Sequence, residues 1–458
     1  MKNYWRDNKT ILAIVFISII SIGAIGTSFY VICPFLQNSQ RLSNMSLGTS
    51  GESEVIWNAM WDGGSTDFGY GVVRSSDGFV YCVGYTENTS YGAGLEDLVL
   101  IKFDSNGTKI WNVTWGGDSN DRGYGVDTDV YGFIYCVGYT ESFGMGYVDL
   151  ALVKYASNGT KIWNVTWGGI GEERGYDISV NSNGFLYCIG STDRPIASST
   201  NFALVKFNMT TGKEIWNTTW GGSGVEVGEG IVEDITGYVY CCGYTSSFGA
   251  GMRDFAIVKF NPNLGTKIWN ITWGGPNEEW ARGITKEYDN DTLYCVGDTM
   301  TFGAGSNDLA LVKINSTTGN RIWNITWGGS SAEYGEDVDM DNNGNIYAVG
   351  LASSYGGSYQ IAVVKFDPNG NYQWKIIWGS ALYYDHGYDL VVLGFDTFYC
   401  VGTKWTASSA GAEDLVLVRF TVPTAEEEPI PGIQLIFVVI ALTSIVIFYL
   451  RRRYVLKL

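Results

Sequence analysis

Histidine is almost absent from this chain of 458 residues, in which His386 is the only one. A metal centre built from several histidines is therefore excluded. A nucleophilic site of the Ser–His kind could use only His386, which lies in the segment YYDHGYD, and the sequence contains no G-x-S-x-G motif. The sequence leaves open whether the chain is an enzyme and favours a role without catalysis.

Basic residues are also scarce. The chain has 29 Lys and Arg against 47 Asp and Glu, which gives a net charge of −18 and a pI near 4.5. Nucleic-acid binding needs clustered Lys and Arg for phosphate contacts, so this composition argues against a nucleic-acid partner. A cationic or metal partner remains compatible with the charge.

Proline and charged residues are few, whereas glycine and aromatic residues are abundant. The chain has 8 Pro and 17% charged residues, beside 60 Gly and 15% aromatic residues. This composition is typical of a β-rich protein with many tight turns. Long helices are not expected between the two ends of the chain.

Long uncharged runs occur at the ends of the chain. Residues 11–32 and 431–450 carry no charge and are long enough to cross a membrane as helices. Basic residues flank them at 1–10 and 451–458, so the positive-inside rule predicts that both termini are cytoplasmic and that the chain between the spans is extracellular. Residues 33–54 are predicted as a linker, and 421–430 as an acidic, proline-containing linker.

Each predicted span has alternatives. The first could be a cleaved signal peptide, although its apolar run is long and no clear A-x-A site follows. The segment YVIC, which ends at Cys33, is a poor match to a lipidation box, because Ile32 stands where a small residue is expected. The C-terminal PIPGIQ, apolar span and RRR resemble the PGF-type sorting signals of archaeal surface proteins, with Ile433 in place of Phe.

Asparagine sequons support an extracellular location. Twelve N-x-S/T sequons precede the second span, and several lie in predicted turns, where a glycan could be carried. Five belong to a repeated WN-x-T segment, which a strand pattern could produce without any glycan. They are Asn44, Asn88, Asn106, Asn112, Asn158, Asn164, Asn208, Asn217, Asn270, Asn290, Asn315 and Asn324.

The main feature between the spans is an internal repeat. KIWNVTWGG stands at 109–117 and again at 161–169, and looser copies bring the total to seven, with leading tryptophans 51 to 54 residues apart. This period indicates one domain of repeated units rather than several unrelated domains. The leading tryptophans are Trp57, Trp111, Trp163, Trp216, Trp269, Trp323 and Trp374.

One repeat contains four short strand patterns. In residues 120–167 these are GYGVDTD (123–129), FIYCVGYT (133–140), DLALVKY (149–155) and KIWNVTW (161–167), with Asn158-Gly159 as the hairpin turn before the last. Four short antiparallel strands per repeat predict a propeller blade. The tryptophans of the last strand share one face and should pack between blades.

The ends of the repeat region predict how the ring closes. An isolated W strand stands at 55–61, and the last repeat ends at 414–420 without a W strand. We therefore predict an all-β, seven-bladed β-propeller of four-stranded antiparallel blades over residues 55–420, latched by its N-terminal strand and flanked by transmembrane helices.

The repeated order G-Y-G-V, G-F-x-Y-x-x-G-Y-T, D-x-x-L-V-K-F and G-x-x-x-W-x-x-x-W-G-G resembles the SBBP-type β-propeller repeat family over about residues 55–420. That resemblance implies an extracellular surface module of bacteria or archaea. It implies no shared enzymatic activity, so function must be argued from sites.

Two further motifs have structural alternatives. Six cysteines occupy equivalent Y-C-x-G positions, which point the same way in successive blades and should be small buried side chains rather than disulfide partners. The vicinal pair Cys241-Cys242, with TTGKEIW (210–216), weakly resembles pyrroloquinoline-quinone dehydrogenases. DMDNNGN (339–345) matches half of a calcium loop but has Gly350 where the bidentate glutamate belongs, which favours a plain hairpin turn.

The most regular charged feature is an acid just after each W strand. Strand direction places these acids in a ring on one face of the propeller, and basic residues occur toward the opposite face. Either the ring accepts hydrogen bonds from adjoining loops, or it is a cation- or partner-binding site. The seven acids are Asp67, Asp121, Glu173, Glu226, Glu279, Glu333 and Asp385.

The sequence as a whole predicts a membrane-anchored cell-surface propeller that acts as a binding or adhesion module through its loop face. Its partner would be an unknown protein or glycan, and no cofactor is predicted apart from calcium as a candidate. The alternatives are a structural envelope component that binds its own copies, and an extracellular enzyme with a site at the propeller channel.

Overall fold

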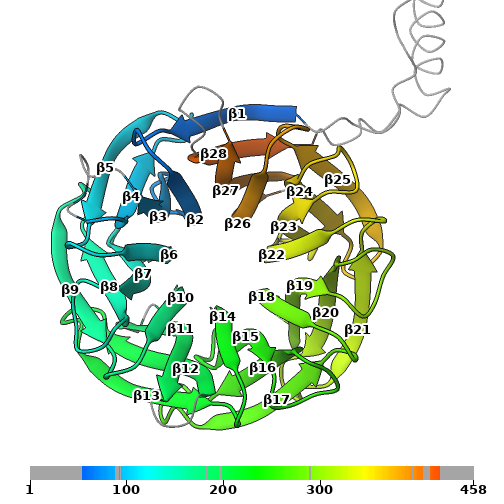
Figure 1. Cartoon of the computed structure of the whole chain (residues 1–458), viewed down its shortest axis with the longest axis horizontal. Coiled ribbons are helices and arrows are strands. Elements are labelled where there is room, and N and C mark those ends of the chain that lie inside the picture. Colours follow the sequence, from blue (N-terminus) through cyan, green and yellow to red (C-terminus); the bar gives the residue numbers. More distant parts are fainter. Residues whose placement is uncertain are drawn as a thin grey trace, which may run out of the picture. The chain divides into compact units, whose positions relative to one another are not determined.

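The computed structural model describes residues 54–422, except for 88–91, 93, 182, 195–198, 288–289, 395 and 406–412. The predicted spans at 11–32 and 431–450 lie outside the described residues. Within the described part, no helix is long and apolar enough to cross a membrane. The described residues form 28 strands arranged as a ring (Figure 1).

The strands form seven four-stranded antiparallel sheets, as the sequence predicts. Blade 1 contains β2 (Asp67–Arg74), β3 (Val80–Thr86), β4 (Asp97–Phe103) and β5 (Lys109–Trp115). Blade 2 contains β6 (Asp121–Thr128), β7 (Ile134–Thr140), β8 (Asp149–Tyr155) and β9 (Lys161–Trp167). Blade 3 contains β10 (Glu173–Val180), β11 (Phe185–Arg194), β12 (Ser199–Asn208) and β13 (Glu214–Trp220). Blade 4 contains β14 (Glu226–Glu233), β15 (Val239–Thr245), β16 (Asp254–Phe260) and β17 (Lys267–Trp273).

Blade 5 contains β18 (Glu279–Lys286), β19 (Thr292–Thr299), β20 (Asp308–Asn315) and β21 (Arg321–Trp327). Blade 6 contains β22 (Glu333–Met340), β23 (Ile346–Ala352), β24 (Gln360–Phe366) and β25 (Tyr372–Trp378). Blade 7 contains β26 (Asp385–Gly394), β27 (Thr397–Trp405), β28 (Glu413–Thr421) and, as its outer strand, β1 (Glu54–Trp61).

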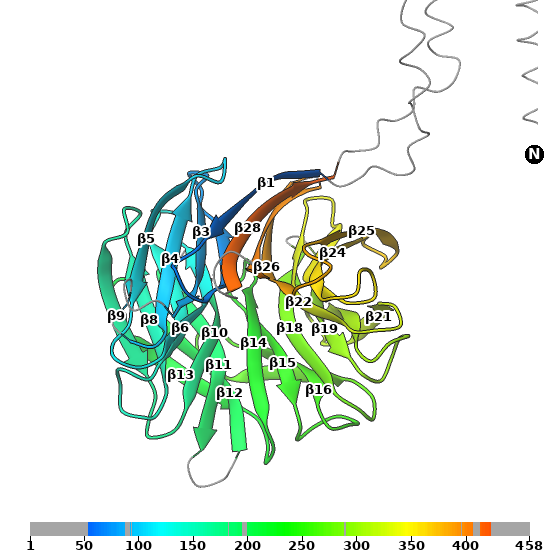
Figure 2. The ribbon, with the colours of Figure 1, turned by 45° about the horizontal axis from the view of Figure 1, so that its top comes forward.

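The predicted latch is confirmed. Strand β1 pairs antiparallel with β28, from Glu54 opposite Thr421 to Trp61 opposite Leu415, and the two strands lie side by side in Figure 2. The propeller therefore spans 54–421, one residue more at each end than predicted. Strand β1 covers the edge of β28 that would otherwise be unpaired, so blade 7 has four strands like the other blades.

The tryptophans lie between blades, as predicted. The Trp115 ring packs 5.3 Å from the ring of Phe143, which belongs to a loop of the next blade. Gly107 (φ +83°), in a turn of blade 1, lies so close to Trp57 of blade 7 that an added Cβ would come within 2.6 Å of the ring. Only glycine accommodates both this backbone conformation and this contact.

Each inner strand contains a bulge that the sequence pattern did not predict. In β2 the pairing with β3 shifts between Gly69 and Gly71, which leaves Tyr70 without a partner opposite it. The same shift occurs in the other six inner strands. A bulge re-aims the side chain of its extra residue, so these residues can line the channel.

The two faces of the ring differ in their connections. We call one end of the ring the loop face. The first strand of each blade, which lies nearest the channel, begins at this end. The loop face also carries the loops that join second to third strands and the loops that join one blade to the next. The opposite end, the turn face, carries the hairpin turns. Because β1 begins and β28 ends at Glu54 and Thr421, the chain enters and leaves the propeller at the turn face.

Candidate functional site

The predicted acidic residues stand at or next to the start of the inner strands, on the loop face, but their side chains are buried. Each of the seven is at most 4% exposed and accepts a hydrogen bond from an amide of the loop before it. Glu226, for example, accepts bonds from the Gly222 amide at 2.7 Å, the Thr245 hydroxyl at 2.9 Å and the Ser247 amide at 3.0 Å. This geometry fits the capping interpretation, and cation binding by the ring stays a prediction.

Substitutions of Glu226 distinguish a hydrogen-bonding role of the acidic ring from a cation-binding role. Glu226→Gln keeps one acceptor oxygen and is expected to cost about 1 kcal/mol, whereas Glu226→Ala leaves buried amides unpaired and should cost about 1–3 kcal/mol. Thermal unfolding of the full chain measures both. If the ring instead gathers cations, calcium should raise the melting temperature of the wild type, and Glu226→Gln should reduce that rise.

The basic residues of the third strands lie toward the turn face, as predicted, but they are not an exposed charged surface. Lys102 is 6% exposed and donates to the Ser157 carbonyl of the next blade at 3.0 Å, and Lys154 donates to Met209 in the same way. Burial lowers the pKa of both lysines. They therefore link neighbouring blades.

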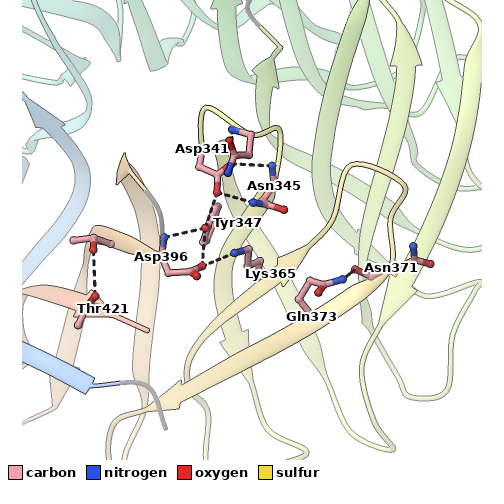
Figure 3. A network of polar contacts seen from close by, with 10 residues as sticks. Asp341, Asn345, Tyr347, Lys365, Asn371, Gln373, Asp396 and Thr421 are labelled. Atoms are coloured by element: carbon pink, nitrogen blue, oxygen red, sulfur yellow. Dashed lines mark hydrogen bonds and ion pairs between the residues drawn. The ribbon is translucent and has the colours of Figure 1, made fainter. Parts of the chain in front are cut away.

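The segment DMDNNGN (339–345), which matches half of a calcium loop in sequence, contains the hairpin turn between β22 and β23. The Asp341 carboxylate accepts the amides of Asn343 and Asn345 at 2.9 and 3.0 Å, and it also accepts the Tyr347 hydroxyl at 3.0 Å. The Tyr347 hydroxyl oxygen also lies 2.9 Å from the carboxylate of Asp396 in the next blade and accepts the Asp396 amide at 3.2 Å, and Lys365 forms an ion pair with that carboxylate (Figure 3). The turn thus joins blades 6 and 7.

The cysteines are buried free thiols in the described part of the chain. Cys241 and Cys242 point to opposite sides of their sheet, because Cys241 packs into the core shared with blade 3 and Cys242 into the core shared with blade 5. The vicinal pair therefore does not form the disulfide of the dehydrogenases that it weakly resembles.

The sevenfold regularity breaks in the channel. The extra residue of each inner-strand bulge faces the channel, and these seven residues form what we call the channel ring. Four members are tyrosines, whereas blades 4, 5 and 6 contribute two glutamates and an arginine. The ring consists of Tyr70, Tyr124, Tyr176, Glu229, Arg282, Glu336 and Tyr388.

The charged half of the channel ring is an ion-pair network. Arg282 Nε lies 3.5 Å from both Glu336 Oε2 and Asp298 Oδ1, and His386 Nε2 lies 3.0 Å from Glu336 Oε1. Burial alone would raise the pKa of Glu336, but Arg282 and His386 hold it below its usual value. Burial raises the pKa of Glu229 to about 7, although Arg282 opposes the shift.

A layer of aspartates joins the channel ring to the blades. The carboxylate of Asp177 accepts a hydrogen bond from the amide of Ile231 in the next blade at 3.0 Å. The carboxylate of Asp389 in blade 7 accepts one from the amide of Val72 in blade 1 at 2.6 Å. Together with the channel ring and Asp337, these residues line a cavity of about 120 Å³. Sequence reasoning missed the channel ring, although the letters DFGY, DRGY, ERGY, EVGE, EWAR, EYGE and DHGY show its asymmetry.

Apolar side chains are exposed on the loop face. Met145 and Tyr147 are 80% and 81% exposed, and Ile170 of the adjoining loop is 69% exposed. The Tyr147 amide donates to the Gly171 carbonyl at 3.2 Å, so the two loops lie against each other. We call these three side chains the loop-face patch. Clustered exposed apolar side chains are typical of interaction sites.

A comparison with protein families identifies the family of this propeller. The model of PQQ_2, the family of the outer membrane protein assembly factor BamB, matches residues 149–381, just over half of the chain. The chain belongs to this family. The PQQ_2 match confirms a β-propeller repeat family, but it does not identify the SBBP type. No curated protein matches the chain.

Solved structures match the PQQ_2 member at low sequence identity. The polysaccharide lyase Uly1 is 8% identical with a TM-score of 0.50, and the match covers 82% of this chain and all of the lyase. Sqt1 from Chaetomium thermophilum is 10% identical with a TM-score of 0.47, over 81% of this chain and all of Sqt1. The PQQ-bound aldose sugar dehydrogenase from Streptomyces coelicolor is 11% identical with a TM-score of 0.39, over 81% and 99% of the two chains. At 8% identity the likeness to Uly1 shows the fold alone.

Proposed function

We propose that this protein is a membrane-anchored cell-surface propeller that binds a protein or glycan partner through its loop face. The observation that carries the proposal is the place where the chain enters and leaves the ring. Glu54 and Thr421 pair at the turn face, so anchors at 11–32 and 431–450 would hold the turn face toward the membrane. The loop face, with its exposed apolar patch, would then point away from the cell.

The positions of the sequons support the same orientation. Those in the described residues lie in hairpin turns of the turn face, such as Asn106 and Asn158, or on outer strands, such as Asn217. The described part of the loop face carries none. Glycans at these positions would cover the turn face and the outer rim, whereas the sequon at Asn88, between β3 and β4, lies outside the described residues. The SBBP-type resemblance fits such an extracellular module.

A second candidate function is an extracellular enzyme that uses the channel. It is favoured by the single histidine, whose ring lies 3.9 Å from that of Tyr388 and whose Nε2 contacts Glu336. Such a pair could carry a proton. The binding module remains the stronger proposal, because no nucleophile accompanies His386 among its described contacts. A structural envelope component that binds its own copies would use the same loop face.

The orientation is tested by amine labelling of intact cells. Lys109 and Lys161 are exposed on outer strands, whereas Lys457 lies in the predicted cytoplasmic tail. A membrane-impermeant amine reagent should label Lys109 and Lys161 in intact cells and Lys457 only after permeabilisation, as read by peptide mass spectrometry. Labelling of Lys457 in intact cells, with protection of the other two, would reverse the topology.

A further inference from the structure

We infer that the channel cavity binds a small organic ammonium group. Two features of the cavity point to this ligand class: four tyrosine rings, contributed by blades 7, 1, 2 and 3, and more carboxyl groups than basic groups in the lining. Neither feature belongs to the loop-face patch. The inference therefore goes beyond the proposed function, and it concerns a free small molecule that enters the channel.

The four tyrosine rings form a continuous row from blade 7 through blades 1 and 2 to blade 3. The ring centroid of Tyr70 lies 4.6 Å from that of Tyr388 and 4.8 Å from that of Tyr124, and Tyr124 lies 5.4 Å from Tyr176. Burial raises the pKa of all four tyrosines, so their phenols stay protonated. Neutral aromatic faces attract alkylammonium groups through the ring quadrupole.

Carboxyl groups outnumber basic groups in the lining of the cavity. Five carboxyl groups stand beside one guanidinium, that of Arg282, and burial and the neighbouring Asp389 hold the pKa of Asp337 well above its usual value. Arg282 is already balanced by Glu336 and Asp298. In contrast, Glu229 accepts no hydrogen bond from the described residues, so its carboxylate is available to a cation. The five carboxyl groups are those of Asp177, Glu229, Glu336, Asp337 and Asp389.

The same geometry disfavours other ligands. A divalent metal ion needs several converging oxygen ligands, but Asp177 and Asp389 already accept backbone amides, and tyrosine faces offer no oxygen. An anion would be repelled by the carboxylates. A cavity of about 120 Å³ holds a few small groups rather than a large ring system.

Binding should strengthen as pH rises. Burial raises the pKa of Glu229, Asp177 and Asp389 to about 7, so each gains negative charge between pH 6 and 8. The charged and titratable groups that face Glu229 are Arg282 and Glu336 on the next two inner strands, and Tyr124, Tyr176 and Tyr244 on other strands. Asp177 and Asp389 both face Asp337, whose pKa is held well above its usual value by burial and by Asp389, and Asp177 also faces Asp127. The guanidinium and the phenols keep their charge state in this range, so Glu229, Asp177 and Asp389 determine the trend.

Calorimetric titration of the full chain, purified in a non-ionic detergent, tests the inference. Tetramethylammonium is the probe, and neopentanol is its neutral counterpart of similar shape. We expect tetramethylammonium to bind at least about tenfold more tightly than neopentanol, and more tightly at pH 8 than at pH 6. Glu229→Gln and Tyr124→Leu should each weaken binding by about tenfold, whereas Tyr124→Phe should retain it. Glu214→Gln, on an outer strand, is the matched control.

Three results would overturn the inference. They are no detectable binding of tetramethylammonium to the wild type, equal binding of tetramethylammonium and neopentanol, and competition by calcium at the same site. Unchanged thermal unfolding of each variant excludes loss of fold as the cause. Failure here would leave the proposed loop-face function standing, because the titration contains no macromolecular partner and no membrane.

Discussion

A variant of the whole chain without residues 50–64 is expected to form an open propeller that no longer stays monomeric. The deletion removes β1 and leaves the edge of β28 that faces β1 without a partner, while the pairing of β28 with β27 remains. It also removes Trp61, which is 3% exposed, and Trp57, whose ring packs 5.6 Å from that of Tyr399. Loss of two such side chains costs several kcal/mol each, so we expect a melting temperature lower by at least about 10 °C together with aggregation through the open edge.

Thermal unfolding and light scattering measure this effect. A deletion of residues 35–49 is the matched control, because it removes the same number of residues outside the described propeller. The latch would be refuted by a 50–64 deletion that stays monomeric and melts at the wild-type temperature. Equal destabilisation by both deletions would assign the effect to the N-terminal segment as a whole rather than to β1.

The repeat made most of the fold predictable, and the latch followed from counting strands. The isolated W strand at 55–61 and the missing W strand after Phe420 allowed one closed arrangement, and β1 and β28 adopt it. Strand boundaries were less accurate. The inner strand of blade 2 starts at Asp121 rather than Gly123, because the buried acid itself belongs to the strand.

The candidate site was harder to predict for two physical reasons. Alternation along DFGYGVV does not reveal the bulge at Tyr70, which depends on pairing with β3, so the channel ring was not recognised. The sequence also shows the charge of Lys102 but not its distance to the Ser157 carbonyl one blade away. For the seven acids it suggested both capping and binding, and only their burial and contacts favour capping.

Loss of partner binding is the other large effect that we expect, and it should follow from three substitutions on the loop face. The variant Met145→Ser/Tyr147→Ser/Ile170→Ser removes the loop-face patch from exposed loops, so the fold should be unaffected. Large exposed side chains at the centre of an interface contribute most of its binding energy. We therefore expect binding to weaken by about tenfold to a hundredfold.

The turn face supplies a matched control with nearly the same exposure. Val130, Tyr131 and Ile235 lie in hairpin turns and are 70%, 84% and 69% exposed, against 80%, 81% and 69% for the loop-face patch. The corresponding serine variant removes three apolar side chains of similar exposure from the opposite face. A difference between the two variants therefore reports position and not hydrophobicity.

Binding through the loop face is tested by retention of the fluorescently labelled full chain, held in nanodiscs, on cells of the source organism that do not carry this protein. We expect saturable retention of the wild type and the turn-face variant, and loss of retention of the loop-face variant. Retention that survives the loop-face substitutions, or that is lost with the turn-face substitutions instead, would contradict binding through the loop face.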